Sequence, residues 1–201
     1  METGRVEAFS DGVLAIAITL LALDLRPGEG PTLGRQLLDH DAVAHYAAYV
    51  VSFLVIGIIW VNHHSVFRQI TRVDRPLLFL NLLLLLFVAA IPFPTALLAK
   101  HLTDPSDSHP AAFAYSAVMF LMGVSFGLLW WWTVRGGRLL DRPMSRAEER
   151  VVVRRFTVGS LAYLALMGLA WVSAPLTLAG HFLVAVYYVL DQVPLARQQA
   201  R

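Results

Sequence analysis

The sequence predicts an all-α protein that crosses a membrane several times. Of its 201 residues, 57% are apolar and only 15% are charged, and the mean hydropathy is +0.61. The apolar residues come in long blocks separated by short charged stretches, a pattern typical of polytopic membrane proteins rather than of soluble domains. The chain contains no cysteine, which excludes disulfides, thiolate chemistry and cysteine-ligated metals.

Six apolar blocks are long enough to span a bilayer as helices, at roughly 18–24 residues each. They cover residues 8–25, 43–62, 77–99, 111–134, 156–173 and 176–193. The loops are short, and only a Ser-Ala-Pro segment separates the last two blocks, which predicts a tight helical hairpin there. We therefore expect residues 1–201 to form one six-helix transmembrane domain without an internal repeat.

The distribution of Lys and Arg predicts how the helices are oriented in the membrane. If the N-terminus is cytoplasmic, 13 of the 16 basic residues lie on the cytoplasmic side and 3 lie outside. The cytoplasmic set is Arg5, Arg68, Arg72, Arg75, Arg135, Arg138, Arg142, Arg146, Arg150, Arg154, Arg155, Arg197 and Arg201, and the outer set is Arg26, Arg35 and Lys100. We therefore expect a multi-pass protein of the inner (plasma) membrane with both termini in the cytoplasm.

Arginines are especially dense between Arg135 and Arg155. Such a stretch can hold a loop on the cytoplasmic side, and it can also bind the head groups of anionic lipids. Setting the topology is the simpler of these two interpretations. The partner expected from this composition is the lipid bilayer, and no nucleic acid is expected.

The first block carries a carboxylate near each end, Asp11 and Asp24. At about 100° per residue, a row of Ile16, Leu20 and Leu23 falls roughly opposite Asp11 on the helix. A carboxylate at membrane depth must face protein or water, so we expect Asp11 to point into the protomer. The periodicity alone leaves open whether the aliphatic row simply faces lipid.

Possible partners for Asp11 lie near the same leaflet. They are Arg5 and Ser10 on the first block, Trp60, His63 and His64 at the end of the second, and Asn81 on the third. A hydrogen-bonded cluster would satisfy polar groups that are costly to bury alone. Its expected members are Arg5, Ser10, Asp11, His64 and Asn81. The two adjacent histidines point about 100° apart on a helix, so we expect no metal site there.

These residues resemble a known family. The segment RVEAFSDGVLAIAITLLALDL is similar to the Arg-x-x-x-Phe-Ser-Asp signature helix of the transmembrane protein 175 family of potassium channels, and Arg5, Phe9, Ser10 and Asp11 complete the signature. The segments WVNHH and LNLLLLLFVAAIPFPT and the six-helix length also match. The resemblance implies a cation channel whose pore is formed by the first helix. A single-repeat chain such as this one implies a homotetramer.

The resemblance also implies which residues line the pore: Ile16, Thr19, Leu20 and Leu23. A fourfold ring of Ile16 would form an apolar constriction that resists wetting and gates conduction. A ring of Thr19 hydroxyls would favour potassium over sodium only modestly, because hydroxyl dipoles replace hydration less completely than a cage of carbonyls. Asp24 would lie at the outer mouth and concentrate cations. Potassium is the permeant ion in this interpretation, and no cofactor is expected.

Two alternatives stay open at this stage. The same pore could conduct protons, as some members of the family are reported to do. A carrier or an intramembrane enzyme could instead use Asp11 with His63 and His64 as acid and base. We expect no enzyme, because no nucleophile, metal set or pair of broken helices accompanies these residues.

Overall fold

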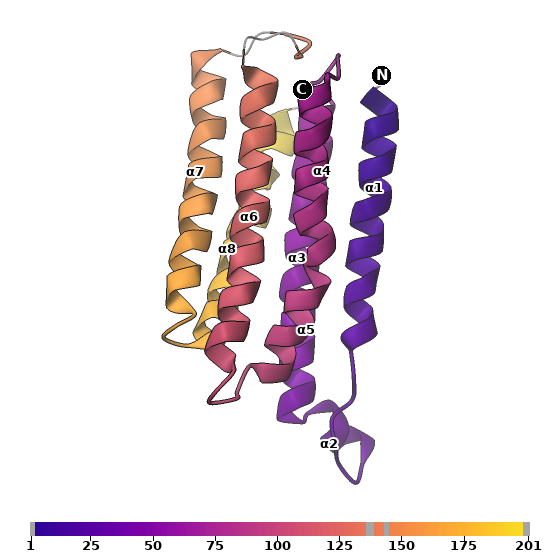
Figure 1. Cartoon of the computed structure of the whole chain (residues 1–201), viewed down its shortest axis with the longest axis vertical. Coiled ribbons are helices and arrows are strands. Elements are labelled where there is room, and N and C mark those ends of the chain that lie inside the picture. The colour runs from indigo at the N-terminus through magenta and orange to yellow at the C-terminus, as the bar shows by residue number, and fades with distance from the viewer. Residues whose placement is uncertain (1–2, 136–138, 143–144, 199–201) are drawn as a thin grey trace.

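The structure is a computed structural model that describes residues 3–135, 139–142 and 145–198, without the side chains of 146, 147, 149, 151, 152, 155 and 191–198. Long helices run side by side along the whole described chain (Figure 1). The predicted all-α class is therefore confirmed. Of the arginines in the predicted cytoplasmic set, Arg138 and Arg201 lie outside the described residues, as do the side chains of Arg146, Arg155 and Arg197.

Six long helical stretches of the described chain correspond to the six predicted spans. The elements are α1 (Thr3–Leu20), the 3₁₀ helix η1 (Leu21–Asp24), α2 (Leu33–Leu37), α3 (His40–Phe67), α4 (Arg75–Ala90), α5 (Pro92–His101), α6 (Ser108–Val134), α7 (Arg146–Leu169) and α8 (Ala174–Gln198). Four stretches are long and apolar enough to cross a membrane, namely Thr3–Asp24, His40–Phe67, Arg75–His101 and Ser108–Val134. The last two helices contain shorter apolar stretches, Phe156–Leu169 and Ala174–Leu190.

The third predicted span is not one continuous helix. The predicted span over 77–99 lies within the apolar stretch Arg75–His101, and that stretch is interrupted at Ile91, between the end of α4 and the start of α5. Pro92 and Pro94 cause the break, because proline lacks a backbone N–H and its ring clashes with the preceding helical turn. The N–H of Ile91 bonds instead to the carbonyl of Val88 at 3.1 Å, as in a tighter turn.

The first predicted span changes geometry near its C-terminal end. Helix α1 begins at Thr3, five residues before the predicted start, and its last turn is the 3₁₀ helix η1. A 3₁₀ turn advances about 120° per residue, so side chains three residues apart stand in line. Leu23 therefore lies nearly below Leu20, rather than displaced from it as a regular α-helix would place it.

Side-chain caps fix the ends of several helices. Asp39 accepts a bond from the N–H of Asp41 at the start of α3, at 3.3 Å. Asp74 accepts one from the N–H of Leu77 at the start of α4, at 2.9 Å. Nε1 of Trp132 also donates to the Asp74 carboxylate, at 3.1 Å from Oδ2, so this cap ties the start of α4 to the end of α6. The starts of α3 and α4 therefore gain acceptors for backbone N–H groups that a helix N-terminus leaves unpaired.

Helix α7 begins with a capping box. The N–H of Glu148 donates to Oγ of Ser145 at 3.2 Å, and the N–H of Ser145 donates to Oε2 of Glu148 at 2.9 Å. Nη2 of Arg142 also donates to Oε1 of Glu148 at 2.7 Å. The guanidinium, followed by the Ser145 donors, lowers the pKa of Glu148 to about 2. The stabilisation that the Glu148 carboxylate gives the cap is therefore fully present above about pH 4.5 and is lost as the pH falls through about 2.

Helix α6 lies in the middle of the bundle, where it packs against α4, α5, α7 and α8. Its fully buried side chains include Tyr115, Met119, Met122, Phe126 and Leu129. Lipid tails are as apolar as these side chains, so burial alone does little to favour helix association in a bilayer. Close packing and hydrogen bonds between helices must supply the remaining free energy of helix association.

Buried hydroxyl groups provide such bonds. Oγ of Ser52 on α3 lies 2.8 Å from Oγ1 of Thr95 on α5 and 3.0 Å from the hydroxyl of Tyr115 on α6. Oγ of Ser116 on α6 lies 3.0 Å from Nε2 of His181 on α8. Polar contacts of this kind hold α3, α5, α6 and α8 together where water is absent.

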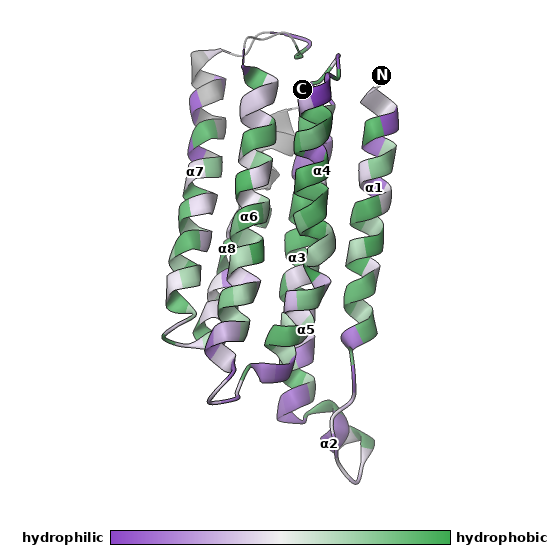
Figure 2. Cartoon of the chain, viewed as in Figure 1, coloured by the Kyte–Doolittle hydropathy of each residue, from purple (hydrophilic) through white to green (hydrophobic). Residues whose placement is uncertain are grey.

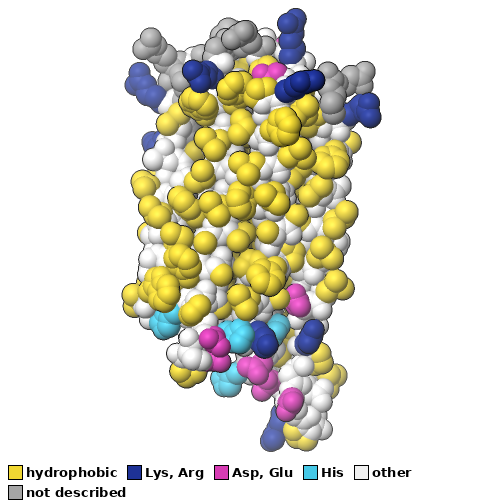
Figure 3. All heavy atoms as spheres, in the orientation of Figure 1, with side chains coloured by type: hydrophobic (Ala, Val, Ile, Leu, Met, Phe, Trp, Pro, Cys, Tyr) yellow, Lys and Arg dark blue, Asp and Glu magenta, His cyan; other side chains and the backbone are white. Residues whose placement is uncertain are grey.

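The ends of the bundle are polar and its middle is apolar (Figure 2). On the face drawn in Figure 3, Lys and Arg gather at the end where α1 begins, and Asp, Glu and His gather towards the opposite end. The start of α1 and the end of α8 lie at the same arginine-rich end (Figure 1). An antiparallel bridge between Ile70 and Leu140 joins two loops at this end.

We expect loss of the α7 cap to loosen the first turn of that helix. Replacing Ser145→Ala removes an N-cap worth about 1 kcal/mol, which corresponds to roughly fivefold lower hydrogen-exchange protection in the first turn. Exchange measured by mass spectrometry on the purified protein checks this. Thr32→Ala is the matched control, because Thr32 occupies the N-cap position of α2 without a side-chain capping bond. Equal effects of both substitutions on their helices would contradict the capping role.

Candidate ion pathway on the first helix

Helix α1 packs against α3 and α4 through one face only. The buried side chains of that face, extended into η1, are Val6, Ser10, Leu14, Ala17 and Leu21. The opposite face is exposed in the protomer, with exposed fractions of 61% for Ile16, 41% for Leu20 and 73% for Leu23. The apolar row predicted from the periodicity is therefore available to contact another chain, lipid or a pore.

Thr19 lies on the exposed side of α1, and its hydroxyl has a defined orientation. Oγ1 of Thr19 donates to the backbone carbonyl of Ile16 at 2.9 Å. This bond uses the only hydrogen of the hydroxyl, so the lone pairs of the oxygen remain available as acceptors. The side chain can therefore offer oxygen to a cation without first breaking a bond that it accepts.

Asp11 is half-buried and faces α3. Its Oδ1 accepts a hydrogen bond from Nε1 of Trp60 at 3.0 Å. An indole N–H is a donor only, and a carboxylate is an acceptor only, so this pair satisfies both groups without a proton change. The contact agrees with the expectation that Asp11 points into the protomer, and Trp60 is its partner.

A second polar chain lies deeper in the bundle. Oγ of Ser10 donates to the carbonyl of Val6 at 2.9 Å, Nδ2 of Asn81 donates to Oγ of Ser10 at 2.9 Å, and Nε2 of His63 lies 2.9 Å from Oδ1 of Asn81. Because Oδ1 of Asn81 can only accept, Nε2 of His63 must carry the proton. Ser10, His63 and Asn81 are all buried, so the chain joins α1, α3 and α4 through buried hydrogen bonds, and Nδ1 of His63 is left without a partner.

The histidine in this chain differs from the expected one. The sequence analysis placed His64 with Asn81, whereas the structure places His63 there and stacks its ring on Phe67 at 4.2 Å between centroids. Nδ1 of His64 instead lies 2.6 Å from Oε1 of Glu7. The adjacent histidines point in different directions on α3, so the expected single cluster is divided into the chain of Ser10, Asn81 and His63 and two separate pairs.

Glu7 was missed by the sequence analysis, although its spacing carried a signal. Glu7 and Asp11 lie one helical turn apart on α1, and His64 and Trp60 lie one turn apart on α3. The two helices run in opposite directions (Figure 1), so equal spacings on each helix produce two successive contacts. Matching the four-residue spacings would have identified the Glu7–His64 pair.

The other expected site residues lie as follows. Arg5 is exposed and makes none of the polar contacts described above for this part of the chain. The prediction that Arg5 belongs to the cluster is therefore wrong. Phe9 is 56% exposed, on the side of α1 that does not pack in the protomer. Asp24 is half-buried at the last residue of η1. Asp11 and His63 bond to different partners, an arrangement that does not suit an acid–base pair.

A group of possible metal ligands lies at the opposite end of the bundle, between α5 and α6. One ligand atom each from His101, Asp104 and Asp107 lies within 4.8 Å of the others. Oδ1 of Asp104 already accepts bonds from Ser106 N, at 2.8 Å, and from Ser106 Oγ, at 2.7 Å. These donors lower the pKa of Asp104 to about 2. The sequence analysis did not identify this group, whose carboxylates also shape the turn before α6.

Known proteins resemble this chain in both sequence and fold. The family model described as "Endosomal/lysosomal potassium channel TMEM175" matches residues 5–92. A Streptomyces collinus protein named as a potassium channel is 53% identical over 99% of this chain and 97% of its own length. A Bos taurus protein named "Endosomal/lysosomal proton channel TMEM175" is 34% identical over 63% of this chain, which is 28% of that protein.

The fold has an equally extensive match. The crystal structure of a lysosomal potassium-selective channel TMEM175 homolog from Chamaesiphon minutus superimposes with a TM-score of 0.83, at 34% sequence identity. The match covers 94% of this chain and 97% of the other. Agreement over nearly the full length of both chains means that all the long helices share one arrangement. The chain therefore belongs to the TMEM175 family.

Proposed function

We propose that this chain forms a potassium-permeable cation channel in which four copies surround a central pore lined by α1. The observation that carries the proposal is the exposed row of Ile16, Leu20 and Leu23 on a helix whose other face is fixed to α3 and α4. Relatives that match nearly the whole chain are named as potassium channels. Membership of this family makes the chain a channel and not an enzyme.

The apolar row suits a gate in such a pore. Four Ile16 side chains around the axis would form a constriction with no polar group to hold water, and such a constriction controls flow by dewetting. Leu20 and the nearly aligned Leu23 would extend the apolar lining outward. This lining is neutral, so cations would pass without a ring of carboxylates at the narrowest point.

Thr19 is the proposed source of selectivity. It lies one turn from the constriction, and its hydroxyl oxygen is free to accept because its hydrogen is bonded to the Ile16 carbonyl. Four such oxygens would replace part of the hydration shell of a potassium ion. The resulting preference for potassium over sodium would be modest, and no cofactor would be required.

We place the channel in the inner (plasma) membrane with both ends of the chain in the cytoplasm. The excess of arginine at the end shared by the start of α1 and the end of α8 supports this orientation. Asp24 would then lie near the outer mouth of the pore. There its carboxylate would raise the local concentration of cations.

Proton conduction is the second candidate function, because animal relatives of this chain are named as proton channels. The two functions would use the same pore. Purified protein in planar bilayers under opposed potassium, sodium and proton gradients separates them. A reversal potential that follows the potassium gradient supports the proposal, and one that follows the proton gradient supports the alternative.

Replacing Ile16→Asn should raise cation flux several-fold, because four amide groups would hydrate the constriction. The measurement is potassium-dependent flux into liposomes. Leu183→Asn is the matched control, because Leu183 on α8 has a similar exposed fraction, at 66% against 61%. If the two substitutions have the same effect on a tetramer of unchanged size, Ile16 faces lipid and is not the gate.

Replacing Asp11→Ala should weaken the assembled channel, because Nε1 of Trp60 would lose its acceptor at a cost of about 1–3 kcal/mol. We expect loss of the tetramer in detergent, measured by size exclusion with light scattering. Asp11→Asn keeps an acceptor oxygen and should preserve the tetramer. Trp60→Phe combined with Asp11→Ala should cost less than the sum of the two single changes. A stable Asp11→Ala tetramer with altered selectivity would instead place Asp11 in the ion path.

Replacing Thr19→Val should remove the potassium preference while conductance persists, since valine keeps the shape of threonine and lacks the hydroxyl. The shift of reversal potential under bi-ionic potassium and sodium conditions measures this effect. Thr19→Ser restores the oxygen and should restore the preference. An unchanged ratio in the valine variant would mean that selectivity arises elsewhere, with Asp24 as the next candidate.

A further inference from the structure

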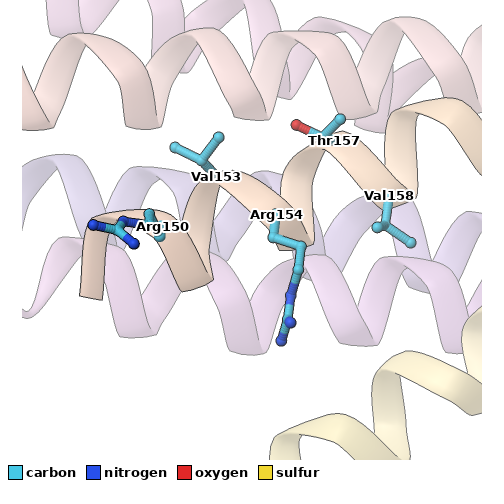
Figure 4. Close-up of a pocket in the computed structure, with 5 residues that line it drawn as sticks. All are labelled: Arg150, Val153, Arg154, Thr157 and Val158. Carbon is cyan, nitrogen blue, oxygen red and sulfur yellow. The ribbon is translucent and has the colours of Figure 1, made fainter. Parts of the chain in front are cut away.

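Helix α7 carries a shallow hollow whose lining residues all lie on one helix face (Figure 4). The residues are Arg150, Val153, Arg154, Thr157 and Val158. Their spacing of three and four residues is that of a single helical stripe. We call this stripe the α7 hollow. It lies within the arginine-rich stretch for which the sequence left two interpretations open.

The α7 hollow has two positive charges that are not neutralised by the described side chains around it. Arg150 and Arg154 are exposed and lie one turn apart, so the two guanidinium groups repel each other. Of the carboxylates that the structure describes, none forms an ion pair with either of them. Glu148 pairs with Arg142 instead, at 2.7 Å, and the side chain of Glu149, which directly precedes Arg150, lies outside the described residues. An anion between the two arginines would therefore relieve an existing repulsion.

Apart from the hydroxyl of Thr157, the rest of the stripe is apolar, and all of it is exposed. The exposed fractions are 53% for Val153 and 46% for Val158, and Leu161 continues the stripe one turn farther at 59%. Arginine side chains near a membrane surface extend towards the head groups, whereas aliphatic side chains contact acyl chains. The α7 hollow thus presents charge and apolar surface in the order in which a phospholipid presents its head group and tail.

The position of α7 in the bundle also suits a lipid. Helices α1 and α7 lie at opposite edges of the protomer (Figure 1). In the proposed tetramer, where α1 surrounds the pore, α7 faces away from the axis. The arginine-rich end lies at the cytoplasmic leaflet in the proposed orientation, and that leaflet is rich in anionic lipids.

We propose that the α7 hollow binds one anionic phospholipid of the cytoplasmic leaflet. Its phosphate lies between Arg150 and Arg154, and one acyl chain follows Val158 and Leu161. This site goes beyond ion conduction, and it rests on the proposed function for the place of α7 away from the pore axis and for the choice of leaflet. Lipid binding can be measured without any flux, so its failure is distinguishable from failure of the channel proposal.

Native mass spectrometry of the full-length protein tests the site by counting bound phosphatidylglycerol and phosphatidylcholine at equal concentrations. Each basic residue near a membrane surface contributes about 1 kcal/mol, so two arginines predict a preference of roughly 30-fold for phosphatidylglycerol. Arg150→Gln combined with Arg154→Gln should abolish the preference. Val158→Trp, which keeps both arginines and fills the α7 hollow, should also reduce phosphatidylglycerol binding.

The matched control is Arg68→Gln combined with Arg72→Gln, which removes two exposed arginines from the same end of the bundle. The control should retain the full preference. An equal loss in the control would overturn the proposal in favour of general surface charge. Displacement of phosphatidylglycerol by inorganic phosphate at comparable concentration, or full binding by the Val158→Trp variant, would overturn the phospholipid as occupant and indicate a site for the anion alone.

Discussion

The structure depends on the pairing of polar groups where the bilayer offers no water. Helix α1 brings a carboxylate and a hydroxyl into a region where an unpaired polar atom is costly. Trp60 donates to Asp11, and Asn81 donates to Ser10. Each bond joins α1 to a different neighbour, so the rotation of α1 about its own axis is determined by two helices at once. The buried apolar side chains of the same face pack around these bonds.

This pairing on one face determines what the other face can do. With Ser10 buried and Asp11 bonded to α3, the row of Ile16, Leu20 and Leu23 has no place inside the protomer and remains exposed. The polar contacts lie in the first half of α1, and the apolar row lies in the second half. Anchoring and the proposed gating therefore occupy different faces and different depths of one helix, and a change in one need not disturb the other.

The two edges of the protomer meet different surroundings in the proposed assembly. At one edge, α1 faces the pore, and at the other, α7 faces lipid, with α6 packed between the inner helices. The loops at the arginine-rich end are joined by the bond from the N–H of Thr71 to the carbonyl of Leu139 at 2.9 Å and by the Asp74–Trp132 contact. A lipid held on α7 would lie at the edge of the bundle opposite the proposed ion path.

The sequence by itself determined the features that depend on neighbours along the chain. Block lengths and hydropathy predicted the helical membrane class, and the 100° period separated the Asp11 face from the Ile16 face, because both properties repeat within a single helix. Pro92 was visible too, and the break at Ile91 could have been predicted from it.

Only the tertiary structure decided which side chains meet. His63 and His64 are chemically alike and adjacent, so no local pattern tells which of them reaches Asn81 and which reaches Glu7. The direction of each ring depends on how α1 packs against both α3 and α4, and that packing is a property of three helices together. The loss of Arg5 from the expected cluster has the same origin, because a residue near the end of α1 reaches the surface once the rotation of the helix has been determined elsewhere.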